Sequence, residues 1–312
     1  MKRSLFPLFD RMSIASILSI AVLCAVLPVR LSGQGCSDAG VCTVPSMRHS
    51  AEPMDASQYL QIGLSYGRGE RGMHAWNSSL QYGTTVGGLV SLDAKAVFSS
   101  HSFGAITASG LADISLSVSV QAADELTLLA GIKLPVADGN HSENGEPLPM
   151  DLQPGLGTVD IIAGLSYSTE HFLVSGALQQ PVRQNANTFI GERSSAASGF
   201  RDFPTTSAFS RAGDLMLRFS VPMRFDAPWM ISPSIIPIYH LANDTYVDSA
   251  GITRSIAGSQ GLTLNAALFI RYTLSHGNSL EWNIGFPLIT RTARPDGLTR
   301  SFVITTEYRM EL

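Results

Sequence analysis

The sequence has few charged residues, few cysteines and no long apolar run beyond its first thirty residues. Asp, Glu, Lys and Arg make up 15% of its 312 residues, whereas about 25% is usual in a soluble globular domain. Past the N-terminal region, no stretch reaches the ~18 consecutive apolar residues of a membrane-spanning helix. The formal net charge is −4, without the clustered basic face of a nucleic-acid-binding protein. These absences exclude helical membrane proteins and give no sign of a nucleic-acid partner.

The N-terminus has the pattern of an export signal. Lys2, Arg3 and Arg11 come before an apolar run over residues 12–27, and a proline and small residues follow. The run is short for a membrane span, so we predict a signal peptide over residues 1–33, cleaved near Gly33. An uncleaved anchor helix is the alternative.

Two of the three cysteines, Cys36 and Cys42, remain after cleavage. In an exported protein two close cysteines predict a disulfide. A metal site is the alternative, but neither His49 nor another nearby residue completes a usual set of four ligands. The segment 34–57 that carries this pair fits either a plug inside the remaining domain or a tail in the periplasm.

From residue 58 onward the chain alternates between apolar and polar residues, the pattern of strands with one apolar face. In the stretch 112–120, for example, Ile114 and Val120 lie on one face and Asp113 on the other. We predict twelve strands, most of them near the 9 to 11 residues that cross a bilayer. Their ranges are 58–68, 73–82, 86–98, 111–121, 126–136, 158–168, 171–181, 213–224, 229–240, 261–273, 279–288 and 301–310.

The connections between these strands alternate in length. Long loops are predicted at 99–110, 137–157, 182–212, 241–260 and 289–300, and short turns at 83–85, 122–125, near 169, 225–228 and 274–278. A soluble sandwich has no reason to sort its loops in this way. The pattern predicts an all-β protein over residues 58–312, a transmembrane antiparallel up-and-down β-barrel with short periplasmic turns and long extracellular loops.

Aromatic residues fall near both ends of the strands, in phase with the apolar face. They are Tyr82, Tyr167, Phe172, Trp229, Tyr272, Trp282 and Tyr308 near the short turns, and Tyr66, Trp76, Phe98, Tyr239, Phe286 and Phe302 near the long loops. Two such girdles mark the two interfaces of a membrane, and aromatics filling a soluble core would not be sorted so. We therefore expect the apolar face to contact lipid, in a closed sheet that satisfies its own backbone hydrogen bonds.

Charged residues of both signs occupy the opposite phase and are candidates for lining the lumen. They are Asp93, Lys95, Asp113, Lys133, Asp160, Arg218, Arg224, Arg271, Glu281 and Glu307. The turns predict that Asp113 lies opposite Lys133 and that Arg271 lies opposite Glu281. Such pairs either support strand register or set which solutes pass. A barrel of this size is too narrow for the wide aqueous pore of the larger porins.

The catalytic and metal-binding motifs of the sequence are weak. Residues 63–67, Gly-Leu-Ser-Tyr-Gly, match a hydrolase pattern, but no helix follows the serine as that motif requires. The loop at 138–146 carries acidic residues and a histidine at a spacing that fits no calcium loop. The sequence therefore predicts no enzyme, no cofactor and no metal site.

Three stretches carry a resemblance to a known family: GLADISLSV (110–118), GIKLPVADG (131–139) and PGLGTVDIIAGLSYS (154–168), with GFPL (285–288) later. They resemble the outer-membrane transporters named for phenol meta-cleavage pathways, which share their architecture with fatty-acid and aromatic-hydrocarbon channels. The resemblance implies uptake of small, often apolar compounds and supplies no catalytic residues.

The favoured function is a passive channel in the outer membrane of a Gram-negative bacterium, for small molecules that include apolar and aromatic ones. Its expected partners are outer-membrane lipid, the solute and the barrel-assembly machinery, although the final residue, Leu312, is not the aromatic residue common in such barrels. The alternative is a barrel that does not transport and acts through the loops at 182–212 and 241–260. An envelope lipid enzyme is a third candidate, but the histidines are scattered and the serines face the lumen.

Overall fold

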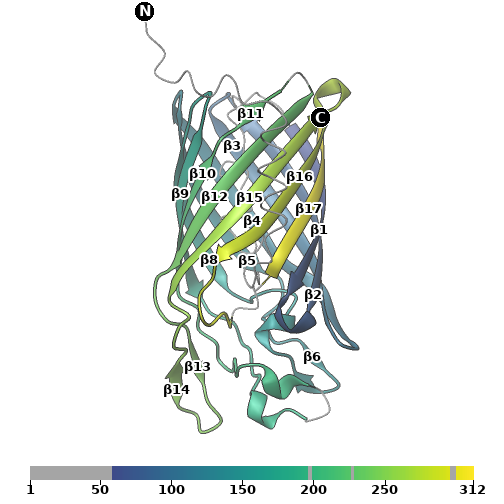
Figure 1. Cartoon of the computed structure of the whole chain (residues 1–312), viewed down its shortest axis with the longest axis vertical. Coiled ribbons are helices and arrows are strands. Elements are labelled where there is room, and N and C mark those ends of the chain that lie inside the picture. The colour runs from purple at the N-terminus through teal and green to yellow at the C-terminus, as the bar shows by residue number, and fades with distance from the viewer. Residues whose placement is uncertain (1–57, 196–198, 226–227, 296–299) are drawn as a thin grey trace, which may run out of the picture. The chain divides into compact units, whose positions relative to one another are not determined.

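The computed structural model describes residues 58–195, 199–225, 228–295 and 300–312. There the chain forms a closed antiparallel barrel of twelve strands (Figure 1), as the alternation predicts. The barrel strands are β1 (Gln58–Gly69), β2 (His74–Val86), β3 (Val90–Phe103), β4 (Ile106–Ala123), β5 (Leu126–Pro135), β8 (Val159–Ser168), β9 (Leu173–Arg183), β10 (Asp214–Ser220), β12 (Trp229–His240), β15 (Gly261–Thr273), β16 (Ser279–Ile289) and β17 (Arg300–Glu311).

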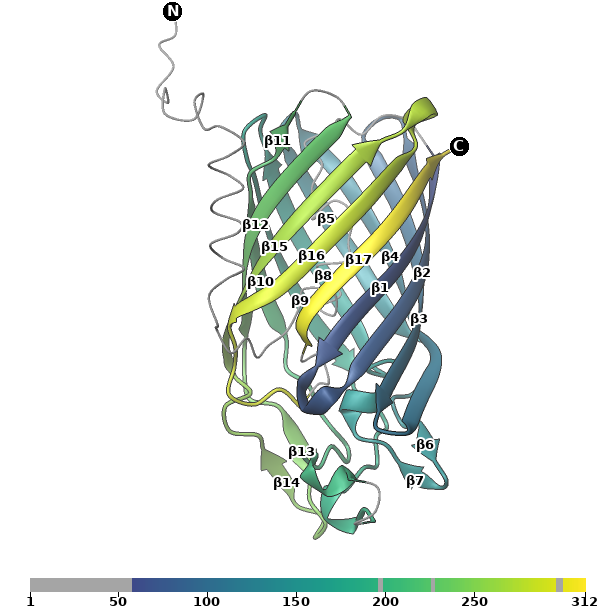
Figure 2. The ribbon, with the colours of Figure 1, turned by 45° about the vertical axis from the view of Figure 1, so that its right-hand side comes forward.

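Neighbouring strands are consecutive barrel strands, and the first and last strands close the ring. β1 pairs with β17 from Tyr59↔Glu311 to Gly69↔Arg300, and Figure 2 shows the two side by side. The short strand β11 (Met223–Arg224) follows β10, and both pair with β12. Pro222 lies between them and has no N–H for the ladder, so the predicted strand 213–224 is interrupted there.

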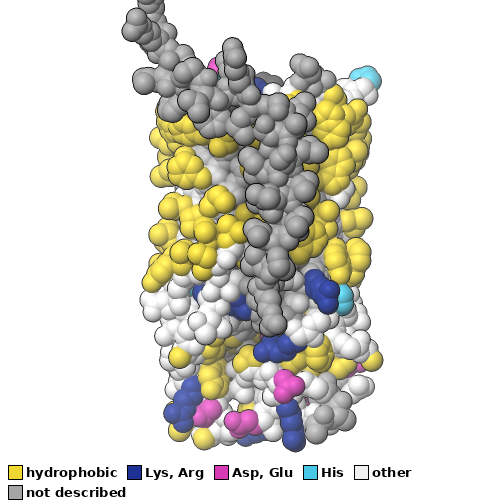
Figure 3. Space-filling view, viewed as in Figure 1, with side chains coloured by type: hydrophobic (Ala, Val, Ile, Leu, Met, Phe, Trp, Pro, Cys, Tyr) yellow, Lys and Arg dark blue, Asp and Glu magenta, His cyan; other side chains and the backbone are white. Residues whose placement is uncertain are grey.

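The outside of the barrel is apolar, which answers the question of which way the alternating faces point. Leu64 on β1 and Phe219 on β10 are 61% and 59% exposed, whereas their neighbours Ser65 and Ser220 are buried. Figure 3 shows apolar side chains covering much of the barrel wall toward the end with the short turns. An exposed apolar surface of this extent is stable only in contact with lipid.

The aromatic girdles are present at both ends of the strands. Near the short turns, Trp229 packs against Tyr272 with 4.7 Å between ring centroids and stacks on Trp282 at 6.4 Å. Near the long loops, the ring centroids of Tyr66 and Trp76 are 4.7 Å apart. We call these two ends of the barrel the short-turn end and the long-loop end.

The long loops carry small elements and an apolar core of their own. The elements are β6 (Ser142–Glu143), β7 (Glu146–Pro147), η4 (Met150–Leu152), η5 (Gly191–Arg193), η7 (Phe200–Asp202), β13 (Thr245–Val247) and β14 (Thr253–Ser255). One core cluster joins Leu148, Phe189 and Phe200 to Ala108 on β4, and Phe103 of β3 packs against it. These loops are therefore folded structures that rest on the end of the barrel.

The predicted long loop at 99–110 is wrong. β3 runs to Phe103 and β4 starts at Ile106, so the connection is a tight turn at Gly104, which has a φ of 57°. β4 has 18 residues, more than the roughly 9 to 11 that cross a bilayer. Outside the membrane neither face needs to be apolar, so the alternation ends before the strand does. The turn predicted at 83–85 is also displaced, because β2 continues to Val86.

Part of the predicted organisation lies outside the described residues. This applies to the signal peptide at 1–33 and to the segment 34–57 with Cys36 and Cys42. Among the residues that are described, none belongs to a helix long and apolar enough to span a membrane.

Candidate functional site

The interior of the barrel holds the side chains that point away from the apolar outer wall, and it is the candidate site. Alternation along each strand places polar residues on this face. Buried inward examples are Gln61, Gln81, Ser119, Lys133, Asp160, Ser175, Gln179, Arg218, Ser232, Asn265, Glu281 and Glu307. Their contacts define three zones: a charged network near the long-loop end, an apolar patch and a set of ion pairs toward the short-turn end.

Lys133 is the centre of the first charged group near the long-loop end. Its Nζ lies 3.2 Å from Asp160 Oδ2 and 3.5 Å from Asp113 Oδ2, and Asp160 is 0% exposed. The predicted register of this pair is wrong, because the β4–β5 turn lies at Asp124–Glu125 and is not centred on Ala123, which places Lys133 opposite Ser115 and Asp113 opposite Pro135. In the ladder on the other side of β5, which joins it to β8, the residue opposite Lys133 is Asp160. Lys133 reaches Asp113 diagonally and so contacts two carboxylates.

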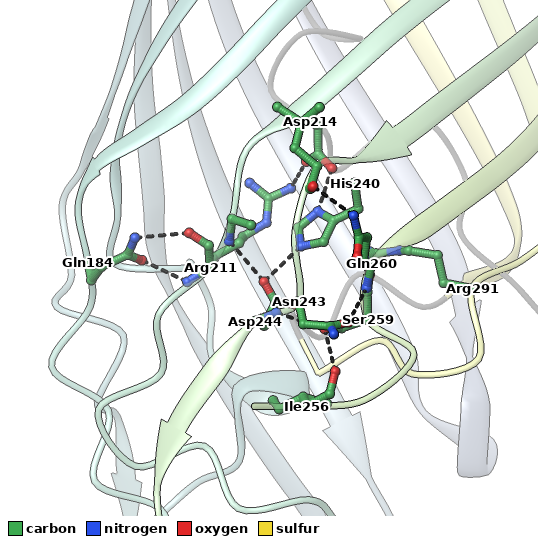
Figure 4. Close-up of polar contacts among 12 residues, drawn as sticks. Gln184, Arg211, Asp214, His240, Asn243, Asp244, Ile256, Ser259, Gln260 and Arg291 are labelled. Atoms are coloured by element: carbon green, nitrogen blue, oxygen red, sulfur yellow. Dashed lines mark hydrogen bonds and ion pairs between the residues drawn. The ribbon is translucent and has the colours of Figure 1, made fainter. Parts of the chain in front are cut away.

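A second charged group joins loop residues to the ends of β10 and β12 (Figure 4). Arg211 binds Asp214, and His240 lies between Asp214 and Asp244. Its Nδ1 is 2.7 Å from Asp214 Oδ1 and its Nε2 is 2.8 Å from Asp244 Oδ1. Because a carboxylate only accepts hydrogen bonds, both ring nitrogens must donate for both contacts to be hydrogen bonds. The geometry therefore fits a positively charged His240.

Further hydrogen bonds extend this group into the loops. The Oγ of Ser259 accepts a hydrogen bond from the Asp244 N–H at 2.8 Å, and Arg291 donates to the Ser259 carbonyl at 2.7 Å. Gln179 donates to Asp160 and lies opposite Asp214 on the neighbouring strand. The two charged groups thus follow one another along the wall from β4 to β12.

An apolar patch lies on the same side of the interior, across six neighbouring strands from β5 to β15. The patch consists of Leu129, Ile162, Ala177, Met216, Ile236, Ile238 and Ala267. Met216 pairs with Ile238 between β10 and β12, and Ile238 and Ile236 pair with Thr263 and Asn265 of β15. The polar side-chain atoms of Thr263 and Asn265 are buried and have no hydrogen-bond partner within the described part of the chain. Neutral polar groups thus border the patch.

Toward the short-turn end, basic side chains are again paired with carboxylates. Arg271 Nε lies 2.9 Å from Glu281 Oε1, and these residues are direct partners in the β15–β16 ladder, as predicted. Lys95 Nζ lies 3.5 Å from Glu307 Oε1, although their strands are separated by β2 and β1. Between them is Gly63, where a Cβ would lie 3.1 Å from the Glu307 side chain, so the glycine leaves room for this side chain.

The remaining sequence candidates have different surroundings. The hydroxyl group of Tyr59 donates a hydrogen bond to the Asp93 carboxylate. The guanidinium carbon of Arg309 lies over the same tyrosine ring, 3.7 Å from its centroid. Arg218 is 1% exposed on β10, whereas Arg224 is exposed in β11. Sequence reasoning missed Arg211, Asp214, His240, Asp244 and Arg291. Asp214 and His240 stand at strand ends in the inward phase, which is a usable signal, but the three loop residues follow no period.

The loop acids at 138–146 do not converge. His141 is exposed, and the Asp138 carboxylate accepts the backbone N–H of Asn140 at 3.0 Å. Among the described residues, no group of three or more His, Cys, Asp or Glu side chains is arranged to hold a metal ion.

The comparisons with known proteins find likeness in structure. No model of a protein family matches the sequence, and no curated protein does. The fold is similar to that of an outer membrane channel from Pseudomonas putida F1, with a TM-score of 0.56, 11% identity and coverage of 84% of this chain and 100% of that chain. The CymD monoaromatic hydrocarbon channel gives a TM-score of 0.43 at 11% identity, over 90% of this chain and 98% of that one. The KdgM porin gives a TM-score of 0.44 at 6% identity, over 81% of this chain and 99% of that one. The first of these likenesses supports the fold, which is that of an outer-membrane barrel.

Proposed function

We propose that this protein is a passive channel in the outer membrane of a Gram-negative bacterium, with its long-loop end facing outward. Its solutes are small, uncharged molecules, including apolar and aromatic ones. The observation that carries this proposal is the apolar patch on the interior wall, next to charged groups that are paired with one another.

The distribution of charge favours uncharged solutes. Lys133, Arg211, Arg271 and Lys95 are each bound to at least one carboxylate, so these pairs offer an ion little net attraction. An ion moving along the patch would lose its hydration against Met216 and the isoleucines, which is costly. An apolar solute gains contact area there, at about 25 cal/mol for each Å² removed from water.

The neutral polar groups beside the patch support a hydroxyl or carbonyl on the solute. The Asn265 amide can donate and accept hydrogen bonds, and it is 0% exposed without a partner among the described residues. A buried group of this kind gains about 0.5–1.5 kcal/mol from a hydrogen bond. Benzyl alcohol has the required chemistry, whereas benzoate and benzylamine share its size and carry a charge.

Uptake by cells with an intact outer membrane and no other general porin tests this proposal. Expression of the protein should speed entry of labelled benzyl alcohol more than that of benzoate or benzylamine. The variant Ile236→Asp puts a charge in the patch and should slow benzyl alcohol uptake severalfold. Ser65→Asp adds the same charge at a buried inward position on β1, whose neighbours β2 and β17 carry no residue of the patch, and is the matched control. Equal uptake with and without the wild-type protein would rule out the channel.

The organisation of the N-terminus is part of the proposal. We infer that residues 1–33 are removed on export, that Cys36 pairs with Cys42, that the segment 34–57 serves as a plug or a periplasmic tail, and that the barrel-assembly machinery inserts the barrel over residues 58–312. Intact mass measurement of the exported protein, with and without reduction and alkylation, tests the first two points. A mass that includes residues 1–33, or alkylation without reduction, would contradict them.

The ordered loops favour a second candidate function, binding of a partner at the cell surface. Phe189, Phe200 and Phe203 are at most 3% exposed in the loop core, so the loops present a fixed surface rather than a changing one. A barrel that binds cells or surfaces but takes up no solute in the experiment above would establish this alternative.

A further inference from the structure

A row of hydrogen-bond donors crosses the outer face of β1, β2 and β3 at the long-loop end. In the ladders, Arg68 pairs with His74 and His74 with Ser102. The outward phase of these strands is set by Leu64 and Trp76, which are 61% and 57% exposed. The row therefore faces away from the lumen.

The next row toward the membrane is aromatic. Tyr66 pairs with Trp76, and Trp76 pairs with Ser100. The Tyr66 hydroxyl lies 2.8 Å from His74 Nδ1, and the two rings stack with centroids 6.0 Å apart. If the hydroxyl donates to Nδ1, the neutral ring carries its proton on Nε2, the other ring nitrogen. Tyr66 thus orients His74 with a donor available to a ligand.

The charge of this surface is positive where it meets the apolar band. Arg68 is exposed, and the partners in both rows are aromatic or carry hydroxyl groups, with no acidic residue among them.

We propose that the Arg68–His74–Ser102 row binds a phosphate group of a phosphorylated glycolipid in the outer leaflet. The choice of the outer leaflet rests on the proposed function, in which the long-loop end faces outward, whereas the binding of phosphate does not depend on it. Aromatic girdles lie at the level of lipid headgroups, so a row just beyond Trp76 stands where the phosphates of such a lipid lie. Guanidinium groups bind phosphate through two parallel hydrogen bonds, and paired residues on neighbouring strands have Cβ atoms about 5 Å apart. One phosphate can therefore contact Arg68 and His74 together, while the acyl chains pack on Trp76 and Leu64.

Native mass spectrometry of the full barrel in detergent, with diphosphoryl lipid A as the probe, tests this site. Arg68→Gln should weaken the lipid adduct about tenfold, and His74→Gln should weaken it less. Arg193→Gln is the matched control, because it removes an equal charge from a loop residue that donates to the Ser249 carbonyl. Fully dephosphorylated lipid A should bind the wild type as weakly as the phosphorylated lipid binds the Arg68→Gln variant.

Other results would overturn the site. Equal losses in the Arg68→Gln and Arg193→Gln variants would mean attraction by overall charge alone. Displacement of the lipid by inorganic phosphate at equal concentration would mean a site for the free ion. The test is separate from the proposed function, because Arg68→Gln should leave benzyl alcohol uptake unchanged. A wild type that binds the lipid but takes up no solute would defeat only the channel.

Discussion

Single residues on β4 test which face of the sheet meets lipid. Val118 pairs with Leu92 and Ala130 on the outward face, and Ser117 pairs with Asp93 on the inward face. Val118→Arg places a charge against hydrocarbon near the middle of the membrane and should cost about 2 to 4 kcal/mol. Ser117→Arg puts the same group beside the Asp93 carboxylate and should cost much less. Urea unfolding of the two variants in lipid vesicles measures the difference, and the reverse order would mean that the faces are inverted.

Lys133 carries the second prediction at this scale. It is 4% exposed and contacts two carboxylates, one of them the fully buried Asp160. Lys133→Met leaves both carboxylates without their cation, and removing one partner of a buried ion pair costs about 3 to 5 kcal/mol. The double variant Lys133→Met with Asp160→Asn should regain part of this loss. Unfolding free energies of the two variants provide the comparison, and an unchanged Lys133→Met variant would show that the ion pairs contribute no stability.

At the scale of elements, the β13–β14 hairpin has a pH dependence set by Asp248. The hydrogen bond from Arg254 Nε at 2.8 Å, together with the backbone N–H groups of Ile252 and Ala250, lowers the pKa of the Asp248 carboxyl below its ordinary value. A carboxyl whose pKa is lower in the folded state adds stability above its unfolded pKa of about 3.9, and this stability is lost as the pH falls through the folded pKa.

Hydrogen exchange of the hairpin amides therefore should show less protection in the wild type as the pH falls below about 4. The Asp248→Asn variant keeps the side-chain carbonyl as an acceptor and loses the titration, so it corrects for the intrinsic effect of pH on exchange. The same loss of protection in both proteins would exclude Asp248 as the cause.

The sequence predicts strands well wherever the membrane imposes the alternation, and less well elsewhere. β12 and β15 have the bounds predicted from their apolar phase, 229–240 and 261–273. Residues 99–110 misled the prediction because β3 and β4 continue past the bilayer, where Ser99 and Ser100 face opposite sides without a difference in polarity. The Asp113 register failed for another reason, since the β4–β5 turn lies at Asp124–Glu125 and is not centred on Ala123, and no glycine or proline marks its position.

At the scale of the whole molecule, a closed barrel with an apolar outer wall predicts how the protein behaves in detergent and in cells. Unheated protein should stay folded in dodecyl sulfate and migrate faster than boiled protein, because the ring of strands leaves no free edge at which unfolding can begin. It should also fractionate with the outer membrane. Migration unaffected by boiling, or recovery as a periplasmic monomer, would contradict the membrane assignment.

The interior was predictable at this scale only in part. Inward charges such as Lys133 and Glu281 follow from the strand phase, and the Arg271–Glu281 pair follows from its short turn. The network around His240 joins β10 and β12 to the loop residues Arg211 and Asp244. These contacts depend on how the loops fold over the end of the barrel. Because that folding is set by a core among the loops themselves, no periodic pattern in the sequence reveals it.

The pairing of β1 with β17 has a consequence for the order of biogenesis. It joins residues near the two ends of the barrel sequence, so this contact has the largest chain separation of all the strand pairs, and closing so long a loop carries the greatest entropic cost. A nascent chain that lacks β17 keeps the pairing of β1 with β2 but leaves the other edge of β1 without a partner, so the sheet remains open with two unpaired edges. Completion of the ring must therefore wait for the last strand.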